Sequence, residues 1–286
     1  MIKIDRPFLK AWAKTILNWY SAVFGILATV LTFVSLDDIY KFSFCCKIVL
    51  LISIAVIVAL IAFCRVFFRR KRRLWTKDSG SVNVIYGDLF KIAEGHADAK
   101  RLIVIPVNTT FDTIIEGPNV ARPLVSENTL HGRWIKLMKS HGLSQDDLQK
   151  AINNSLEQKG NSNHYKIKSR VKGNDKYYDL GTCATYIEGN NCFVLLALFE
   201  FDENNKAHCT EDNLSDAIKG LVYSIDGMQG YKCYVPVMGT GLSRTSISYK
   251  DALKELANGM RFYSYNIHCE MNIVIYNKNI ASIYDV

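Results

Sequence analysis

The sequence predicts an α/β protein in which a three-layer α/β/α domain with a mixed sheet follows a two-helix transmembrane hairpin. Over residues 78–286, short segments rich in Val, Ile and Tyr alternate with longer amphipathic segments, which is typical of strands covered by helices. Residues 1–77 instead contain two long apolar runs, which predict membrane-spanning helices. We therefore expect two domains: a hairpin with a basic juxtamembrane segment over 1–77, and an α/β domain over 78–286.

The first apolar run extends without a charge from Ile16 to Leu36, and the second extends from Ile48 to Cys64. Each is long enough to cross ~30 Å of hydrocarbon, or most of it, as a helix. A secretory signal peptide is the alternative for the first run, but the length of that run and the second run directly after it argue against one. Asp37 and Asp38 interrupt the apolar sequence between the two runs.

Basic residues gather on the outer sides of the hairpin. Residues 1–77 hold 13 of the 35 Lys and Arg residues and only 3 acidic residues, whereas residues 78–286 hold 22 basic and 24 acidic residues. By the positive-inside rule, we expect both termini in the cytoplasm and the connecting turn outside. The basic run also suits anionic lipid headgroups. Since the α/β domain has no basic surplus, nucleic acid is not an expected partner.

Turn residues separate the expected strands and helices of the α/β domain. Arg101–Val107 is almost continuously apolar, as expected of a strand buried on both faces. Turn residues at 188–191 predict a hairpin, and the polar segment Lys159–Lys176 is expected to form a strand or hairpin with an exposed tip. In chain order, we expect strands at Val82–Tyr86, Arg101–Val107, Gly181–Ile187, Cys192–Phe201, Tyr234–Val237 and Asn272–Tyr276, and helices at Glu127–His141 (N-cap Ser126 or Asn128), Leu143–Gln158, Asn213–Met228 and Ser246–Tyr263.

The eight cysteines do not show the paired spacing of a zinc site, so no metal is expected. No cofactor is expected either. A cytoplasmic location of the α/β domain disfavours disulfides. We therefore interpret the cysteines as small apolar residues, with lipidation of Cys45 or Cys46 as the alternative.

Two of the predicted strand ends carry a polar side chain suited to a nucleotide. Gly87-Asp88-Leu89 follows the first strand, where the Asp88 carboxylate is able to accept a hydrogen bond from an exocyclic amine while a neighbouring N–H meets a ring nitrogen. Asn108 ends the second strand, at the edge where ligands bind in open α/β sheets. The alternatives are a turn Asp at position 88 and an Asx residue that stabilises a turn at position 108.

A third strand end carries the glycine-containing loop Gly239-Thr240-Gly241-Leu242-Ser243. Two glycines around a hydroxyl residue let backbone N–H groups converge near a helix N-terminus, which suits a diphosphate. A tight strand-to-helix turn without a ligand is the alternative. Arg244, which follows, is either a phosphate partner or a solvated residue at the start of the helix.

Taken together, these motifs resemble those of the macro domain, the ADP-ribose-binding module, over roughly 78–286. The matching segments are Gly87-Asp88-Leu89, Pro106-Val107-Asn108 and Val235–Ser243. The resemblance implies a macro-like fold in which Asp88 and Leu89 read the adenine and Asn108 lies near the distal ribose. It further implies that Gly239–Ser243 cradle the diphosphate and that Tyr276 stacks on the adenine, with a buried ring as the alternative for Tyr276.

The segment after Asn108 departs from macro domains that hydrolyse ADP-ribose linkages, which usually carry a glycine-rich run there. Here Asp112–Asn119 has a single glycine and bulky isoleucines, so no catalytic residue is expected. Asn108–Thr113 followed by Ser126–Gly132, which ends in Leu130-His131-Gly132, instead resembles a divergent macro-like subgroup of bacterial defence proteins. In that resemblance, Asp112 and His131 meet the extra group of a conjugated ligand; the alternative is that 130–132 only start a helix.

A two-span hairpin fused to such a domain resembles the membrane effector of type II Thoeris anti-phage systems. In that family a TIR-domain partner makes an ADP-ribose conjugate such as histidine–ADP-ribose. The effector senses this signal, and its oligomerisation and disruption of the membrane lead to abortive infection. The resemblance implies a homo-oligomer that acts on lipid in the bacterial inner membrane. The alternatives are a membrane-tethered ADP-ribosyl hydrolase and a passive reader of ADP-ribosylated proteins.

Overall fold

The computed structural model describes residues 6–33, 43–77, 79–95, 99–117, 119–121, 123–158, 164–166, 172–201, 207–240, 247–276 and 280–286. The chain forms two compact units, Met1–Arg70 and Lys71–Val286. This division falls earlier than the expected one after Lys77, because Lys71–Lys77 form strand β1 and pair with β2 (Gly80–Tyr86). The expected boundary is corrected accordingly: these basic residues belong to the sheet and not to the hairpin.

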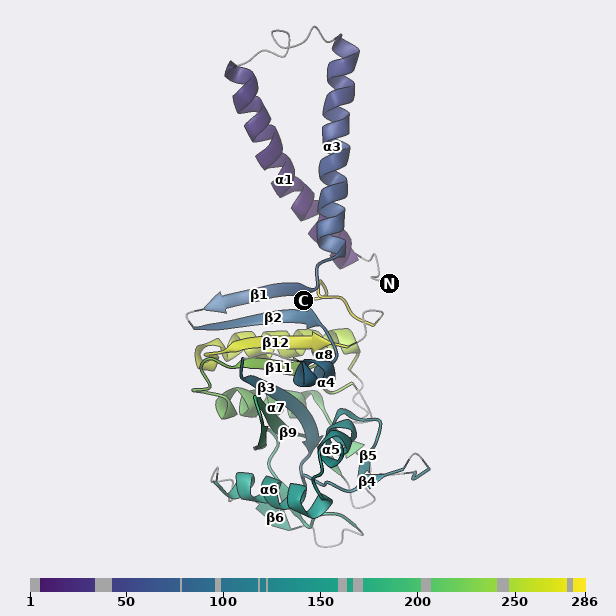
Figure 1. Ribbon diagram of the computed structural model, residues 1–286, viewed down its shortest axis with the longest axis vertical. Coiled ribbons are helices and arrows are strands. Elements are labelled where there is room, and N and C mark those ends of the chain that lie inside the picture. Colours follow the sequence, from purple (N-terminus) through teal and green to yellow (C-terminus); the bar gives the residue numbers. More distant parts are fainter. Residues whose placement is uncertain are drawn as a thin grey trace. The chain divides into compact units, whose positions relative to one another are not determined.

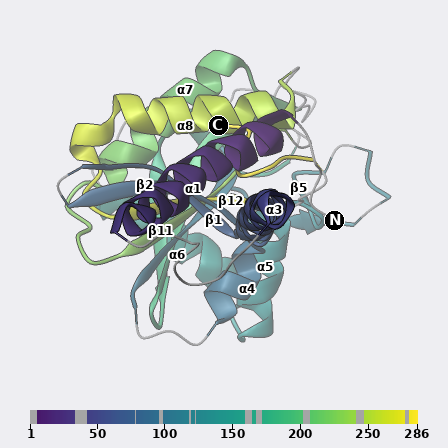
Figure 2. The same cartoon turned by 90° about the horizontal axis from the view of Figure 1, so that it is seen from above.

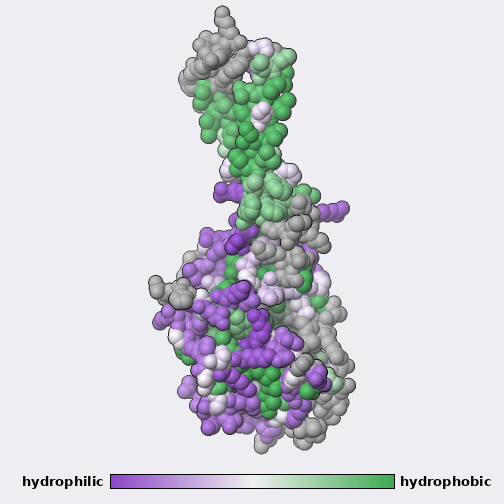
Figure 3. All heavy atoms as spheres, turned by 45° about the vertical axis from the view of Figure 1, so that its right-hand side comes forward, coloured by the Kyte–Doolittle hydropathy of each residue, from purple (hydrophilic) through white to green (hydrophobic). Residues whose placement is uncertain are grey.

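The first unit consists of helices α1 (Arg6–Phe33) and α3 (Phe44–Phe67). Within the described part of the chain, only Cys45–Phe67 is found to be long and apolar enough to cross a membrane. Apolar side chains of α3 are exposed along its length, as the green surface of this unit in Figure 3 shows. The first expected span coincides with α1 as far as Phe33, whereas its last residues and the turn at 37–41 lie outside the described residues.

The two helices contact each other along the first half of α1. Trp12 Nε1 donates a hydrogen bond to the carbonyl of Ala59 at 3.1 Å, and the Tyr20 hydroxyl donates to the carbonyl of Ala55 at 2.7 Å. Beyond this region the helices diverge (Figure 1), and a Cβ added at Gly25 would meet nothing within 4 Å. Aromatic side chains in the first half of α1 therefore bind the backbone of α3.

The second unit is built on an eight-stranded mixed sheet (Figure 1). Five neighbouring strands run parallel, and β1, β8 and β10 are antiparallel to their partners. The order is β1, β2, β12 (Glu270–Ile275), β11 (Lys232–Pro236), β3 (Arg101–Asn108), β9 (Asn191–Phe201) and β10 (Ala207–His208), with β8 (Cys183–Glu188) also paired to β9. The predicted mixed sheet and the predicted hairpin of β8 and β9 are confirmed.

Two smaller strand pairs lie outside this sheet. β4 (Ile115–Glu116) runs parallel to β5 (Val125–Ser126), and β6 (His164–Lys166) pairs antiparallel with β7 (Lys176–Tyr178). The second pair confirms the hairpin that was one of the two expectations for the polar segment Lys159–Lys176. Its tip lies outside the described residues.

Helices cover both faces of the sheet (Figure 2). Strand β3 requires cover on both sides, because its successive side chains point to opposite faces of the sheet and almost all of them are buried. Ile103, Ile105 and Val107 join one apolar core with the helices on their side, and Leu102 and Val104 are buried toward the other. One face carries α4 (Leu89–Glu94), α5 (Leu130–Ser140) and α6 (Gln145–Gln158), and the other carries α7 (Glu211–Ser224) and α8 (Tyr249–Phe262), which the short 3₁₀ helix η1 (Ser264–Asn266) follows. The three-layer α/β/α architecture is confirmed.

The start of α5 differs from the sequence prediction. Thr129 is its N-cap, with Oγ1 accepting a hydrogen bond from Gly132 N at 3.0 Å, so neither Ser126 nor Asn128 has that role. α8 begins at Tyr249 after the N-cap Ser248, three positions later than expected, and the predicted start at 246 lies outside the described residues. Propensity fixes the existence of these helices better than their first residue.

Candidate functional site

The candidate site lies where four parallel strands end. β2, β12, β11 and β3 are neighbours in the sheet and run in the same direction, so their carboxyl ends share one edge. Asp88 follows β2, Tyr276 follows β12, Gly239 follows β11, and Asn108 ends β3. The topology thus brings to one edge the motifs that the sequence places far apart. Gly241, Leu242 and Ser243, together with Arg244, lie outside the described residues.

The Asp88 side chain has three partners in the protein, namely the backbone N–H groups of Phe90 and Lys91 and the Arg133 guanidinium. Its Oδ1 accepts a hydrogen bond from Phe90 N at 2.9 Å, which makes it the N-cap of α4. Its Oδ2 lies 3.4 Å from Arg133 Nη2 of α5. Asp88 therefore has the turn-stabilising role that was the alternative to adenine binding. A carboxylate has about four acceptor positions, so an amine donor can still bind beside these partners. Leu89 is buried.

Asn108 and Asp112 hold each other at the end of β3. Asn108 Nδ2 donates to Asp112 Oδ2 at 2.7 Å, and Asp112 N donates to Asn108 Oδ1 at 3.1 Å. Thr110 Oγ1 donates to the same Oδ2 at 2.6 Å, and all three side chains are buried. The Asn108 amide therefore shapes the loop after β3, as the turn-stabilising alternative expected, and fixes where Asp112 points.

Asn174 fastens a second segment of the chain onto this loop. Its backbone N–H donates to Asp112 Oδ1 at 2.7 Å, and its Nδ2 donates to the carbonyl of Thr110 at 2.8 Å. Between these two points Phe111 adopts φ 51°, a left-handed conformation that is uncommon for a residue other than glycine. The buried ring of Phe111 packs edge-on against Tyr178 at 5.6 Å. Strain of this kind is retained where the surroundings determine the backbone on several sides.

The isoleucine-containing segment that follows is also tied down. Glu116 forms an ion pair with Lys172, and its second oxygen accepts a hydrogen bond from Leu124 N at 2.7 Å. The segment from Asp112 to Glu116 is thus anchored at both ends. This rigidity replaces the freedom that a glycine-rich segment would have.

His131 is a buried, neutral imidazole next to this network. Only 3% of the residue is exposed, and its ring stacks on Trp134 with centroids 6.4 Å apart. Burial lowers the pKa of His131 to about 4, although the nearby Asp112 carboxylate acts in the opposite direction. Nε2 is buried and has no hydrogen-bond partner among the described residues. Gly132 is required beside it, because a Cβ there would lie 2.2 Å from the Ser126 carbonyl oxygen.

The described beginning of the phosphate-loop motif fits the predicted turn. Gly239 has φ 84°, the left-handed conformation from which consecutive N–H groups can converge, and Thr240 is half-buried. Tyr276, at the neighbouring strand end, is 67% exposed, so the buried-ring alternative is wrong. Burial raises the pKa of Tyr249 to about 12, and a hydrogen bond to the backbone of Tyr276 opposes this shift. Tyr249 thereby links the start of α8 to this edge.

Sequence reasoning missed Asn174, Arg133, Tyr249 and the backbone conformation of Phe111. Asn174 lies in a polar stretch with no motif, and its partner is 62 positions away along the chain. No composition signal marks a left-handed phenylalanine. Arg133 has a weak signal, since it follows the Leu130-His131-Gly132 motif on the helix that faces Asp88. Among the described residues no three His, Cys, Asp or Glu side chains are grouped as metal ligands.

The fold and the arrangement of its strand ends define a macro domain. The family model for the macro domain of the Thoeris protein ThsA matches residues 82–276, so the chain belongs to this family, which places it in the context of anti-phage defence. The chain is 24% identical over 235 residues to the Thoeris protein ThsA of Bacillus amyloliquefaciens strain Y2, with 81% of this chain and 72% of that protein covered.

Solved structures of macro domains also resemble this chain. A glycine-to-valine variant of the Oceanobacillus iheyensis macrodomain with ADPR has a TM-score of 0.46 at 11% identity, covering 75% of this chain and 94% of that one. The macrodomain of the same organism with ADP has a TM-score of 0.45 at 12% identity, covering 75% and 92%.

Proposed function

We propose that this chain is a membrane effector of type II Thoeris anti-phage defence that senses an ADP-ribose-derived signal. In this proposal a TIR-domain partner makes the signal, such as histidine–ADP-ribose, and the macro domain binds it without hydrolysing it. Binding drives homo-oligomerisation in the bacterial inner membrane and disruption of that membrane. The observation that carries the proposal is the gathering of Asp88, Asn108, Gly239 and Tyr276 at one sheet edge in a ThsA-type macro domain.

The residues along that edge suit the adenine, the diphosphate and the distal ribose of such a ligand, in that order. The Asp88 carboxylate is an acceptor for the adenine amine, and the exposed ring of Tyr276 offers a stacking surface. The turn at Gly239 begins a nest of N–H donors for the diphosphate. Asn108 and Asp112 lie at the neighbouring strand end, where the distal ribose and its conjugated group would follow.

The buried network after β3 favours binding over catalysis. Both oxygens of Asp112 already accept hydrogen bonds from protein donors, so the carboxylate is held as a structural acceptor and not as a free base. His131 is neutral and buried beside it. A ligand that reaches this end of the site must exchange donors with Asn174 or Thr110, which selects for a ligand with hydrogen-bonding groups of its own.

The apolar surface of the first unit supports the membrane half of the proposal. The exposed apolar side chains of α3 are costly in water and stable in lipid. We place both termini in the cytoplasm, with α1 as the first span and α3 as the second. Because two helices cannot enclose a pore, membrane damage requires several copies. Shifting one two-state assembly from 1:99 to 99:1 takes about 5.5 kcal/mol of differential ligand affinity, which several copies would share.

Ligand binding is tested by titrating ADP-ribose and histidine–ADP-ribose into the full-length chain in detergent while its mass is followed by light scattering. We expect binding and a shift to higher mass. Asp88→Ser keeps an N-cap residue for α4 but removes the carboxylate, so it should weaken binding roughly ten- to hundredfold. Asp216→Ala, an exposed site on α7, is the matched control and should bind as the native chain does.

Membrane function is tested with the same proteins in dye-filled liposomes. Leakage should require the ligand and should be lost in Asp88→Ser but not in Asp216→Ala. Turnover of an ADP-ribosylated substrate by the purified chain would instead establish the hydrolase. Binding with neither leakage nor a mass change would leave the passive reader as the correct description.

A further inference from the structure

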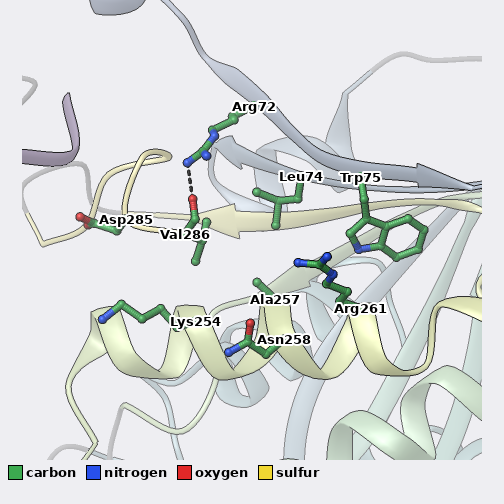
Figure 4. Close-up of a pocket in the computed structure, with 9 residues that line it drawn as sticks. All are labelled: Arg72, Leu74, Trp75, Lys254, Ala257, Asn258, Arg261, Asp285 and Val286. Atoms are coloured by element: carbon green, nitrogen blue, oxygen red, sulfur yellow. Dashed lines mark hydrogen bonds between the residues drawn. The ribbon is translucent and has the colours of Figure 1, made fainter. Parts of the chain in front are cut away.

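A cavity of about 520 Å³ lies between β1 and α8 (Figure 4). Helix α8 covers the face of the sheet opposite α4, α5 and α6 (Figure 2). The carboxyl-edge residues Asp88, Asn108, Gly239 and Tyr276 do not line the cavity. We propose that this cavity is a second binding site, and that it takes a phosphate-bearing organic group.

A bulge in β1 builds one wall of the cavity. Arg72 pairs with Val84 and Trp75 pairs with Val82, so the register shifts by one residue between Arg73 and Trp75. In a regular strand, alternate side chains face opposite sides, and Trp75 would point away from Leu74's side of the sheet. The bulge brings both Leu74 and Trp75 to the cavity, beside Arg72. Bulges of this kind commonly re-aim a side chain at a functional site.

A polar row on α8 builds the opposite wall. Lys254, Asn258 and Arg261 recur at spacings of four and three, which places them on one side of the helix, and all three line the cavity. Lys254 Nζ lies 3.1 Å from Asp251 on its own helix. The side chains of Asn258 and Arg261 are exposed and have no hydrogen bond or ion pair with any described residue. In Figure 4 the Arg261 guanidinium extends from α8 into the space below Leu74 and Trp75.

Donors outnumber acceptors in this space. Trp75 Nε1 is buried and has no partner among the described residues. The one acidic side chain in the lining, Asp285, already accepts from Lys250 Nζ at 3.0 Å and from Ser282 N at 2.7 Å. Of the three cationic side chains in the lining, Arg72 donates to backbone oxygens of Ile283 and Val286, and Lys254 pairs with Asp251. The Arg261 guanidinium and the Trp75 indole N–H have no acceptor among the described residues. These two donors suit an anion with several acceptor oxygens.

The size and the apolar part of the lining make that anion an organic one. A cavity of about 520 Å³ is far larger than the ~30 Å³ share of one water molecule, and it lies in the range of small-molecule sites. Leu74, Trp75 and Ala257 offer carbon surface for the body of the molecule. A phosphate monoester or diester with a glycerol-sized body fits both requirements.

Chain connectivity makes a lipid headgroup the nearest source of such a group. Arg72 follows the last residue of α3, Phe67, by five positions, a length of chain that spans at most about 18 Å. If α3 crosses the membrane, anionic headgroups are within reach of β1. A soluble phosphate ester is the other source. Only the choice of the lipid source rests on the proposed membrane function; the chemistry of the cavity does not.

The test is native mass spectrometry of the full-length chain in detergent, with phosphatidylglycerol or sn-glycerol 3-phosphate as the added probe. Arg261→Gln should weaken binding of the preferred probe about tenfold or more, because it removes a charged donor. Trp75→Phe keeps the apolar wall but removes the N–H, and should weaken binding less. Lys219→Gln on α7 changes the net charge equally at an exposed position outside the cavity, and should have no effect.

If the native chain retains phosphatidylglycerol and the Arg261→Gln chain does not, the site is established with a lipid source. Binding of glycerol phosphate alone, with the same loss, establishes it with a soluble source. Absence of binding, or binding that neither Arg261→Gln nor Trp75→Phe changes, overturns the proposal. The Arg261→Gln chain should still bind ADP-ribose derivatives as the native chain does, so failure of this proposal is distinct from failure of the sensor proposal.

Discussion

The carboxyl edge of the sheet and the β1–α8 cavity handle polar groups in opposite ways. At the edge, the Asp112 carboxylate accepts hydrogen bonds from Asn108, Thr110 and Asn174. The protein itself therefore supplies the donors for this acceptor. In the cavity, Arg261 and Trp75 offer donors for which the described residues supply no acceptor. The Trp75 N–H is buried, and a buried polar group without a partner is costly, whereas the exposed Arg261 guanidinium remains open to solvent or to a ligand. The edge is therefore pre-organised, whereas the cavity is incomplete.

The largest effect is expected from breaking the edge network. Asp112→Ala removes the acceptor for two buried donors and one half-buried donor, and we expect a loss of about 3 kcal/mol or more in the free energy of unfolding. Asp216→Ala on α7 removes an exposed carboxylate and should change it by less than about 0.5 kcal/mol. Urea unfolding followed by tryptophan fluorescence measures both. Equal stability of the two variants would show that the network is not structural.

The next effect is a pH dependence that comes from His131. Its pKa is about 4 in the folded chain and near 6.5 when unfolded, so the unfolded chain binds the extra proton between these values. Stability is therefore lost as the pH falls, by about 2 kcal/mol between pH 7.5 and pH 5 from this residue alone. His131→Phe should unfold with a correspondingly smaller pH dependence. An identical dependence in both chains would contradict the burial of a neutral imidazole.

A smaller effect separates the two roles of Asp88. Asp88→Ala should lower stability by about 1 kcal/mol, because α4 loses its N-cap, whereas Asp88→Ser should lower it much less. Both should lose affinity for ADP-ribose-type ligands. Thermal unfolding and calorimetric titration of the two variants give the comparison. If Asp88→Ser binds the ligand as the native chain does and only Asp88→Ala binds more weakly, Asp88 acts as a helix cap and does not contact the ligand.

The smallest expected effect concerns the cavity itself. Because the Arg261 side chain has no hydrogen bond or ion pair with any described residue, Arg261→Gln should change the free energy of unfolding by less than about 0.5 kcal/mol without added lipid or phosphate ester. Added phosphatidylglycerol should raise the melting temperature of the native chain more than that of the variant. A loss above about 1 kcal/mol without any ligand would make Arg261 part of the fold and remove the contrast with the carboxyl edge.

The comparison also shows which features the sequence reveals. Short motifs at strand ends predicted Asp88, Asn108 and Gly239, because a parallel sheet brings its carboxyl ends to one edge whatever the loop lengths. Asn174 escaped prediction because its contact with Asp112 depends on how a polar hairpin folds back across 62 positions. No local sequence pattern indicates that Asn174 contacts Asp112.

Strand β1 escaped prediction for a different reason. Its basic residues read as the flank of a membrane helix, and the bulge between Arg73 and Trp75 breaks the alternation that identifies a strand. Helix α4 spans only six residues, too few for a helical period to appear. In both cases pairing and packing with distant segments, and not local propensity, decided the structure.

The central claim is that an ADP-ribose-type ligand binds at the carboxyl edge of a ThsA-type macro domain. Hydrogen–deuterium exchange of the full-length chain, with and without saturating histidine–ADP-ribose, tests it most directly. We predict slower exchange in peptides that cover 87–93, 108–113 and 236–240, and unchanged exchange across β1 and the last two turns of α8. Protection confined to β1 and α8, or no protection at saturating ligand, would contradict the account.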